Sequence, residues 1–283
     1  MIEVSLKSSD LLYLSVSLYE VQNSKGVILI VPGLNEYKER YKEFINYLNN
    51  NGYSVVIYDP RGQGKSTNDL NKLGVINDDK KLINDFNIII SYIKNRFINK
   101  TIYLVADSLG ALTALCTLDS NELIKKVVLI SPLYQDNINT NLKTVKSLLN
   151  FYGKDKESTF FQNILGFGKK CVILKDLGAL SLLKNDPNCF YNYKNISVYQ
   201  ILKMEENIKS LKYRNNFKLL ILTGVLDVTL SGKENVCILL DILRKNNCLD
   251  ITCLEYPNMG HKILFEPSRT LVYQDILNFF TNS

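Results

Sequence analysis

The chain has no tryptophan, and its 283 residues include a single histidine, His261. The six cysteines show neither a CxxC pair nor the Cys/His spacing of a zinc site. This spacing argues against a structural metal site and a disulfide framework, and it is typical of reduced thiols in the cytoplasm. We therefore predict a protein that binds no metal and needs no cofactor.

Two kinds of apolar segment are also missing. Residues 2–19 alternate apolar and polar side chains, as edge strands do, and lack the basic start and continuous apolar stretch of a signal peptide. No run of about 18 apolar residues occurs, so no membrane-spanning helix is predicted. Together with the cysteines, these absences predict a cytoplasmic protein.

Excess positive charge is confined to one segment. Residues 135–216 contain 13 Lys and Arg against 7 Asp and Glu, whereas the remainder holds 21 against 21. A solvated, lysine-coated face explains this bias, and transient contact with an anionic lipid surface is the functional alternative. No nucleic-acid-binding motif accompanies the charge, so nucleic acid is not an expected partner.

Short apolar stretches alternate with amphipathic ones over most of the chain. Buried strands are predicted at 26–33, 53–59, 101–105, 125–132, 217–224 and 249–256. Helices are predicted near 37–50, 82–98, 109–116, 232–245 and 267–280. This order predicts an α/β fold with a mostly parallel sheet, helices on both faces, and functional sites at the carboxyl ends of strands.

The alternation stops after Pro132 and resumes at Phe217. The residues between hold their own apolar clusters and a helix predicted near 198–211. We interpret residues 134–213 as a helical cap inserted between two core strands, with 1–133 and 214–283 forming the core.

A strand, a sharp turn and a helix are predicted over residues 101–116, with Ser108 at the turn. Small residues two before and two after Ser108, Ala106 and Gly110, suit a nucleophile elbow, which lifts a serine hydroxyl above the sheet edge. The usual pattern is GxSxG, and here Ala106 takes the first glycine position. A serine at a helix start also serves as an N-cap, so the elbow alone leaves both roles open.

The single histidine and one aspartate decide between these roles. His261 follows the last predicted strand, and Asp227 comes three residues after Gly224, where the preceding strand ends. A serine nucleophile needs a histidine base that is oriented by an acid. The chain order Ser108, Asp227, His261 is that of α/β-hydrolases, and we predict these three as the catalytic residues.

An oxyanion hole needs two N–H groups that point at one developing charge. Leu109 follows the nucleophile and supplies one. Leu34, after Gly33 in the loop that follows the strand 26–33, is predicted to supply the other. The glycine-rich loop at 60–66 lacks the GxxxxGK[ST] spacing of a phosphate-binding loop.

These motifs together resemble the monoacylglycerol lipase and lysophospholipase branch of the serine α/β-hydrolases, also called serine aminopeptidase S33-like. The matching segments are PGLNEYKERY (32–41) to HGxxEHxxRY, YDPRGQGKS (58–66) to DxRGHGxS, ADSLGA (106–111) to GHSMGG, NDP (185–187) to a cap motif, LTGVLDVTLS (222–231) to the GxxD acid loop, and MGHKILFE (259–266) to the histidine loop. The resemblance implies an α/β-hydrolase fold, the same triad and oxyanion hole, and a cap that shapes an acyl tunnel.

Four departures from the family pattern matter most for the site. Pro32, Gln63 and Asp107 replace histidines, and Ala106 replaces a glycine. The triad is spared, but Asp107 places a negative charge beside the nucleophile unless it turns into the sheet or pairs with a cation.

The sequence predicts a serine ester hydrolase that acts on lipophilic monoesters, such as monoacylglycerols or lysophospholipids. Phe160, Phe161 and Phe167 are candidates for contact with the acyl chain or for plain cap core. Two alternatives stay open: another acyl hydrolase on the same fold, a thioesterase or a peptidase, and a catalytically silent binding protein.

Overall fold

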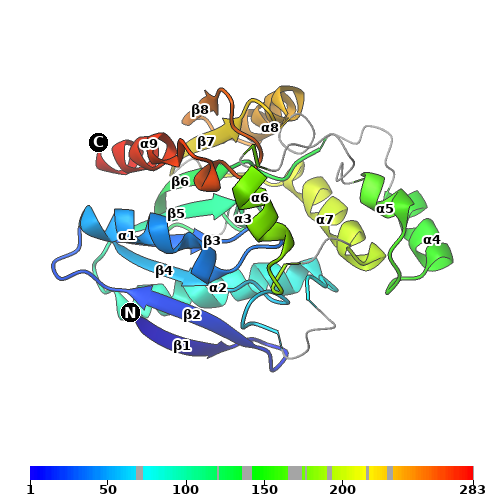
Figure 1. The fold of residues 1–283 in the computed structure, drawn as a ribbon, viewed down its shortest axis with the longest axis horizontal. Helices are drawn as coiled ribbons and strands as arrows, with labels where there is room; N and C mark the ends of the chain where they lie inside the picture. The colour runs from blue at the N-terminus through cyan, green and yellow to red at the C-terminus, as the bar shows by residue number, and fades with distance from the viewer. Residues whose placement is uncertain are drawn as a thin grey trace.

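A computed structural model gives the arrangement of most of the chain (Figure 1). It describes residues 1–67, 73–119, 121–135, 142–164, 174–175, 177–189, 193–214, 217–227 and 232–282.

The centre of the fold is an eight-stranded sheet in the order β1-β2-β4-β3-β5-β6-β7-β8. The strands are β1 (Ile2–Lys7), β2 (Tyr13–Tyr19), β3 (Val27–Val31), β4 (Ser54–Tyr58), β5 (Ile102–Asp107), β6 (Ile124–Ile130), β7 (Lys218–Gly224) and β8 (Ile251–Tyr256). β1 and β2 form an antiparallel edge, and β3 to β8 run parallel to one another. The predicted α/β architecture with a mostly parallel sheet is confirmed.

The sheet has an apolar core on each face. All five residues of β3 are buried, as a strand covered on both sides requires. Because successive side chains point to opposite faces, Leu29 joins one core while Ile28 and Ile30 join the other.

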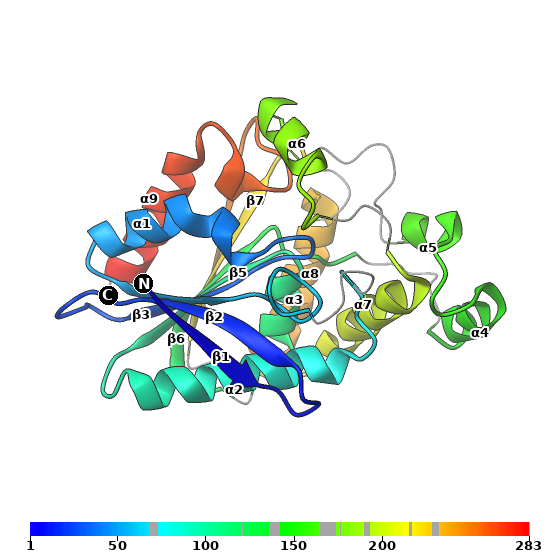
Figure 2. The same cartoon turned by 60° about the horizontal axis from the view of Figure 1, so that its bottom comes forward.

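Helices cover both faces of the sheet (Figure 2). α1 (Lys42–Asn50) and α9 (Arg269–Thr281) pack with the core that contains Ile28. α2 (Asp79–Arg96), α3 (Leu109–Leu115) and α8 (Lys233–Lys245) pack with the core that contains Leu29.

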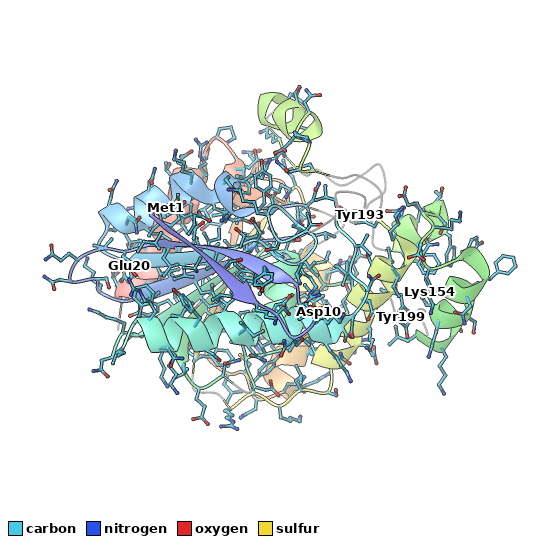
Figure 3. The ribbon with its side chains drawn as sticks, turned by 90° about the horizontal axis from the view of Figure 1, so that it is seen from below. Met1, Asp10, Glu20, Lys154, Tyr193 and Tyr199 are labelled. Carbon is cyan, nitrogen blue, oxygen red and sulfur yellow. The ribbon has the colours of Figure 1, made fainter. Side chains whose placement is uncertain are left out.

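Helices also fill the break between β6 and β7. They are α4 (Leu142–Tyr152), α5 (Thr159–Ile164), α6 (Leu177–Lys184) and α7 (Asn195–Ile208). α7 packs on α2 and α3, whereas α4 and α5 pack on α7. Figure 3 shows Lys154 and Tyr193 of this segment at the end of the molecule opposite Met1.

Several element ends differ from the prediction because local hydrogen bonds, rather than apolar periodicity, fix them. The helix predicted over 37–50 is a 3-10 turn, η1 (Lys38–Tyr41), followed by α1. α2 begins at Asp79, not near Leu82, because the side chain of Asp78 accepts a hydrogen bond from the N–H of Lys80 at 3.0 Å. None of the described helices is long and apolar enough to cross a bilayer.

Candidate active site

The three residues predicted to be catalytic lie at the carboxyl edge of the parallel strands. Ser108 follows β5, Asp227 follows β7, and His261 lies in the loop after β8. Parallel strands deliver the residues after their carboxyl ends to one edge of the sheet. Residues 153 positions apart are thereby brought into hydrogen-bond contact.

Ser108 occupies a strained turn. Its backbone has φ 51° and ψ −110°, a left-handed conformation that is costly for a residue with a side chain. Position 110, two residues later, accommodates only glycine, since a Cβ there would lie 2.3 Å from the carbonyl oxygen of Val31. The Ser108 side chain makes no capping bond to α3, so the geometry favours the elbow over the N-cap.

A hydrogen-bonded chain joins the three side chains. Nε2 of His261 lies 2.9 Å from Oγ of Ser108, and Nδ1 of His261 lies 2.6 Å from Oδ2 of Asp227. All three residues are buried, and Asp227 is fully so. A buried carboxylate on Nδ1 keeps that nitrogen protonated, so Nε2 is left to accept the serine proton.

The loops that carry the acid and the histidine approach each other closely. The N–H of Leu226 donates to the carbonyl of Met259 at 2.9 Å. A Cβ at Gly224 would lie 2.2 Å from the carbonyl oxygen of Gly260. The GxxD spacing therefore has a steric reason, since only glycine lets the end of β7 meet the histidine loop.

The local electrostatics favour a protonated imidazole. Burial disfavours the charged form of His261, but the carboxylates of Asp227 and Asp107 outweigh burial and raise the pKa of His261 above its ordinary value of 6.5. The same two carboxylates favour the charged, imidazolium form of His261.

The backbone N–H groups of Leu34 and Leu109 are the two donors predicted beside Ser108. Leu109 is the first residue of α3, where a helical N–H has no intrahelical partner. Leu34 follows Gly33, where an added Cβ would lie only 3.0 Å from the Cβ of Ser108. Neither N–H donates a hydrogen bond to another described residue.

Gln63 holds the loop that contains Leu34. Its Oε1 accepts hydrogen bonds from the N–H groups of Asn35 and, at 3.2 Å, Glu36. Its Nε2 donates to the carbonyl of Gly33 at 3.1 Å. The amide thus fixes the backbone on both sides of Leu34, a role that Gln63 fills in the position of a family histidine.

The side chain of Asp107 is buried and bonds to Tyr41. The Tyr41 hydroxyl donates to Oδ2 of Asp107 at 2.7 Å and accepts from the N–H of Gly33 at 3.4 Å. Burial raises the pKa of Asp107 to about 6, although the charge of His261 and the Tyr41 hydroxyl both oppose this rise. Asp107 therefore supports the loop before Leu34 through Tyr41 instead of pairing with a cation.

Gln63→Leu is expected to lower kcat for ester hydrolysis by about 30-fold, because a misplaced donor loses much of what an oxyanion-hole N–H contributes. KM should change little, since the substrate ground state does not depend on this N–H. Steady-state kinetics check the split. Gln162→Leu is the matched control: its amide bonds the backbone of Tyr193 in the helical insertion, and kcat should persist there. A kcat within twofold of wild type for Gln63→Leu would contradict the role.

A buried ionic group joins both catalytic loops to the insertion. Glu36 is fully buried and accepts hydrogen bonds from Lys262, next to His261, and from Arg40. Arg40 lies 3.7 Å from Asp186, which also accepts from the Tyr37 hydroxyl at 2.6 Å. Separating a buried ion pair leaves an unpaired charge in the interior, which is costly. We therefore expect these ion pairs to hold the two loops in place relative to the segment after α6.

The aromatic residues predicted to contact an acyl chain lie in the helical insertion. Phe161 is fully buried, Phe160 is half-exposed, and their rings contact each other and Tyr152. Phe167 lies outside the described residues. In the part of the chain that the structure describes, no three His, Cys, Asp or Glu side chains gather as metal ligands would.

Sequence reasoning missed two supporting residues, Tyr41 and the part played by Gln63. The sequence indicates Tyr41 only as one residue of the helix predicted near 37–50, and Gln63 only as a departure from the family pattern. The signal for both was the joint replacement of histidines at 63 and 107, which calls for new hydrogen-bond partners around the loop 33–36.

The family model described as serine aminopeptidase, S33 matches residues 22–268. A protein named probable lysophospholipase L2 from Haemophilus influenzae is 29% identical over 152 residues, which are 53% of this chain and 45% of that protein. The chain thus spans about half the length of this curated relative.

Solved structures share the fold. A thermostable carboxyl esterase from Bacillus coagulans, in complex with glycerol, aligns with a TM-score of 0.86 and 17% identity, covering 99% of this chain and 97% of its own. A soluble variant of monoglyceride lipase from Saccharomyces cerevisiae, in complex with a substrate analog, aligns with a TM-score of 0.75 and 17% identity, covering 99% and 94%. At these identities the likeness establishes the α/β-hydrolase fold.

Proposed function

The chain belongs to the serine aminopeptidase S33 family, and we propose that it is a serine ester hydrolase acting on lipophilic monoesters such as monoacylglycerols or lysophospholipids. The observation that carries the proposal is the hydrogen-bonded chain from Ser108 through His261 to Asp227. The relatives named as a lysophospholipase, a carboxyl esterase and a monoglyceride lipase support the ester class.

The reaction proceeds through an acyl-enzyme. Oγ of Ser108 attacks the ester carbonyl carbon while Nε2 of His261 takes the hydroxyl proton. The tetrahedral intermediate then collapses, the bond to the alcohol oxygen breaks, and His261 returns the proton to that oxygen. A water molecule, deprotonated by His261, attacks the acyl carbonyl in turn. The bond to Oγ of Ser108 then breaks, His261 returns the proton to that oxygen, and the fatty acid leaves.

The oxyanion of each tetrahedral intermediate rests on the N–H groups of Leu34 and Leu109. Fixed donors of this kind stabilise charge that exists only in the transition state, so they raise kcat rather than ground-state binding. Gln63 and Tyr41 keep the Leu34 N–H in place through the bonds to its loop.

Residues 134–213 act as a cap over the core formed by 1–133 and 214–283. The packing of α7 on α2 and α3 and the bond from Tyr37 to Asp186 support this division, because both tie the insertion to the sheet's carboxyl edge. Phe160 and Phe161 remain candidates for contact with the acyl chain, with Phe161 so placed that it also serves as cap core.

A fluorophosphonate probe and an ester panel test the proposal together. The probe should label wild type at Ser108, and the enzyme should hydrolyse p-nitrophenyl esters and monoacylglycerols of increasing chain length. Thioesters and aminoacyl p-nitroanilides report the thioesterase and peptidase alternatives. Absence of an adduct on Ser108 would leave the chain as a silent binding protein and end the catalytic proposal.

The pH profile is expected to have an acid limb above pH 6.5. His261 acts as a base only when neutral, and Asp227 and Asp107 raise its pKa despite burial, so kcat/KM should fall as the pH drops through that raised pKa. Because His261 and Asp107 interact, the apparent pKa of this acid limb belongs to the coupled pair and not to His261 alone. Measurement of kcat/KM from about pH 5 to 9 checks this, and a flat profile would contradict the base role.

Transient contact with anionic lipid is part of the proposal. Phe151 is 82% exposed and contacts Tyr152, whose ring stacks on half-exposed Phe160, and Lys154 lies close by in sequence. Exposed aromatic rings beside lysines favour the interface of an anionic membrane.

Phe151→Ala should lower binding to phosphatidylglycerol-containing vesicles about 30-fold, since burying a phenylalanine contributes about 2 kcal/mol. Co-sedimentation measures the binding. Ile98→Ala is the control, because it removes an exposed apolar side chain from outside the helical insertion. Equal loss in both variants would argue against a specific surface.

A further inference from the structure

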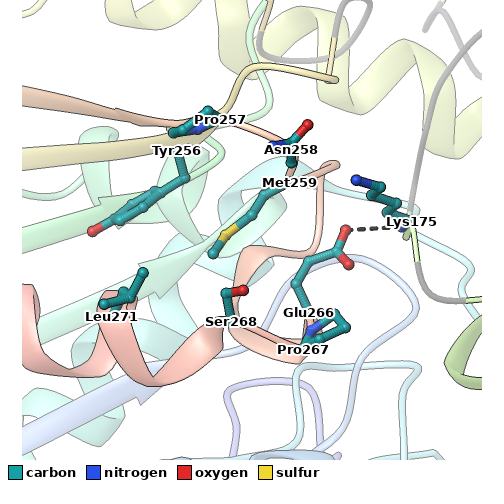
Figure 4. Close-up of a pocket in the computed structure, with 9 residues that line it drawn as sticks. All are labelled: Lys175, Tyr256, Pro257, Asn258, Met259, Glu266, Pro267, Ser268 and Leu271. Carbon is teal, nitrogen blue, oxygen red and sulfur yellow. Dashed lines mark hydrogen bonds between the residues drawn. The ribbon is translucent and has the colours of Figure 1, made fainter.

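A second pocket lies beside the histidine loop, apart from the catalytic residues (Figure 4). Its volume is about 510 Å³, within the range of small-molecule sites. The walls come from the end of β8 and the loop after it, from the residues that begin α9, and from Lys175 of the helical insertion. Neither Ser108, Asp227 nor His261 lines it.

The carboxylate of Glu266 is the distinctive group of this pocket. Glu266 is 1% exposed, and its Oε1 accepts the N–H groups of Gly260 at 2.9 Å and Lys175 at 2.8 Å. Its Oε2 is buried and has no hydrogen-bond partner. A carboxylate offers about four acceptor positions, and a buried oxygen without a donor is costly, so Oε2 is suited to a donor from a ligand.

No described cationic group lies within ion-pair distance of this carboxylate, although the side chain of Lys175 lines the same pocket. Among the described residues, both partners of Glu266 are neutral backbone N–H groups, and no ion pair includes its side chain. Arg269, three residues away, pairs instead with Glu43 at 2.8 Å. A buried carboxylate with only neutral donors favours a cationic ligand over a neutral one.

The remaining walls are largely apolar. Pro257, Pro267 and the half-exposed Leu271 line the pocket around Glu266, and Met259 is buried beside them. Among the described residues that line the pocket, only Lys175 is basic, and its charge disfavours a ligand with two positive charges. The chemistry selects a single cationic head on a short apolar body.

We propose that this pocket binds a small primary alkylammonium ion. The ammonium group donates to Oε2 of Glu266, and the alkyl chain lies against Pro257, Pro267 and Leu271. Oε1 of the same carboxylate accepts a hydrogen bond from the N–H of Gly260, the residue before His261. Glu266 alone therefore links a bound ligand to the loop that carries His261.

Calorimetric titration of the Ser108→Ala protein tests binding without reference to catalysis. n-Butylammonium should bind at least tenfold more tightly than 1-butanol, and butanoate should not bind. Glycerophosphoethanolamine, which presents the ammonium on a lipid head group, is compared with n-butylammonium: binding of either supports the site, and the tighter of the two identifies the source. Equal affinity for butanol and n-butylammonium would overturn the proposal.

Two variants locate the site. Glu266→Gln should weaken n-butylammonium binding at least tenfold, and Leu271→Lys, at an exposed position, should do the same by placing a tethered ammonium in the pocket. Glu255→Gln removes an exposed charge nearby and should change nothing. Unchanged affinity in Leu271→Lys would overturn the proposal even if Glu266→Gln fails to fold. Since the titration needs no active serine, this outcome is separate from the fate of the proposed esterase function.

Discussion

Ser108→Ala is expected to lower kcat/KM for ester hydrolysis by at least about 10⁴-fold, because it removes the hydroxyl that lies 2.9 Å from Nε2 of His261 and is proposed to form the acyl-enzyme. The fluorophosphonate adduct should vanish with it. The fold should persist, since alanine loses only the hydroxyl, whose described bond is to His261. Kinetics, intact-mass spectrometry of the probe adduct and a melting curve check the three outcomes.

Ser131→Ala is the matched control for this variant. Ser131 directly follows β6, the strand next to β5, is fully buried and also has a positive φ, 40°. Its hydroxyl has no described hydrogen-bond partner, so activity should stay within about threefold of wild type. If Ser131→Ala loses as much as Ser108→Ala, the loss reflects the packing of the strand ends and not the nucleophile.

The sheet could be predicted from the sequence because its central strands are covered on both faces. A strand such as β3, VILIV, has no polar face and therefore reads as a continuous apolar run. The antiparallel edge was also visible, since β1 and β2 alternate polar and apolar residues. The start of α2 could not be predicted, because the N-cap residue Asp78 comes before the apolar pattern begins.

The positions of Ser108, Asp227 and His261 could be predicted because each follows a strand, and parallel strands bring their carboxyl ends together. The hydrogen bonds that support the loop 33–36 could not be predicted. They depend on where the side chains of Gln63 and Tyr41 point, and a glutamine in a glycine-rich loop has no periodic signal. Only the folded chain brings Gln63 to the backbone of Gly33 and Asn35.

The departures from the family pattern are coupled in space. Gln63 bonds the loop 33–36 from one side, and Asp107 bonds it from the other through Tyr41. A charged residue beside the nucleophile thus becomes a support for a neutral backbone donor. Its negative charge also helps to raise the pKa of His261, so the same residue acts on both the base and the loop.

Asp227→Asn is expected to lower kcat by about 10⁴-fold at neutral pH. An asparagine can donate to Nδ1 of His261, which would hold the imidazole with its proton on Nε2 and deny Ser108 an acceptor. Removing the carboxylate also lowers the pKa of His261, since Asp227 is the largest influence that raises it. Single-turnover kinetics across pH measure the loss, and an activity within tenfold of wild type would contradict the orienting role.

Asp107→Asn is the matched control, because it neutralises the other buried carboxylate that acts on His261. Its amide oxygen can still accept from Tyr41, so the loop before Leu34 should keep its support. Above pH 7 activity should equal or exceed that of wild type, because a negative charge near the developing oxyanion is gone. The acid limb should move to lower pH, since Asp107 no longer raises the pKa of His261. A loss as large as that of Asp227→Asn would make Asp107 the acid that orients the histidine and reverse the assignment.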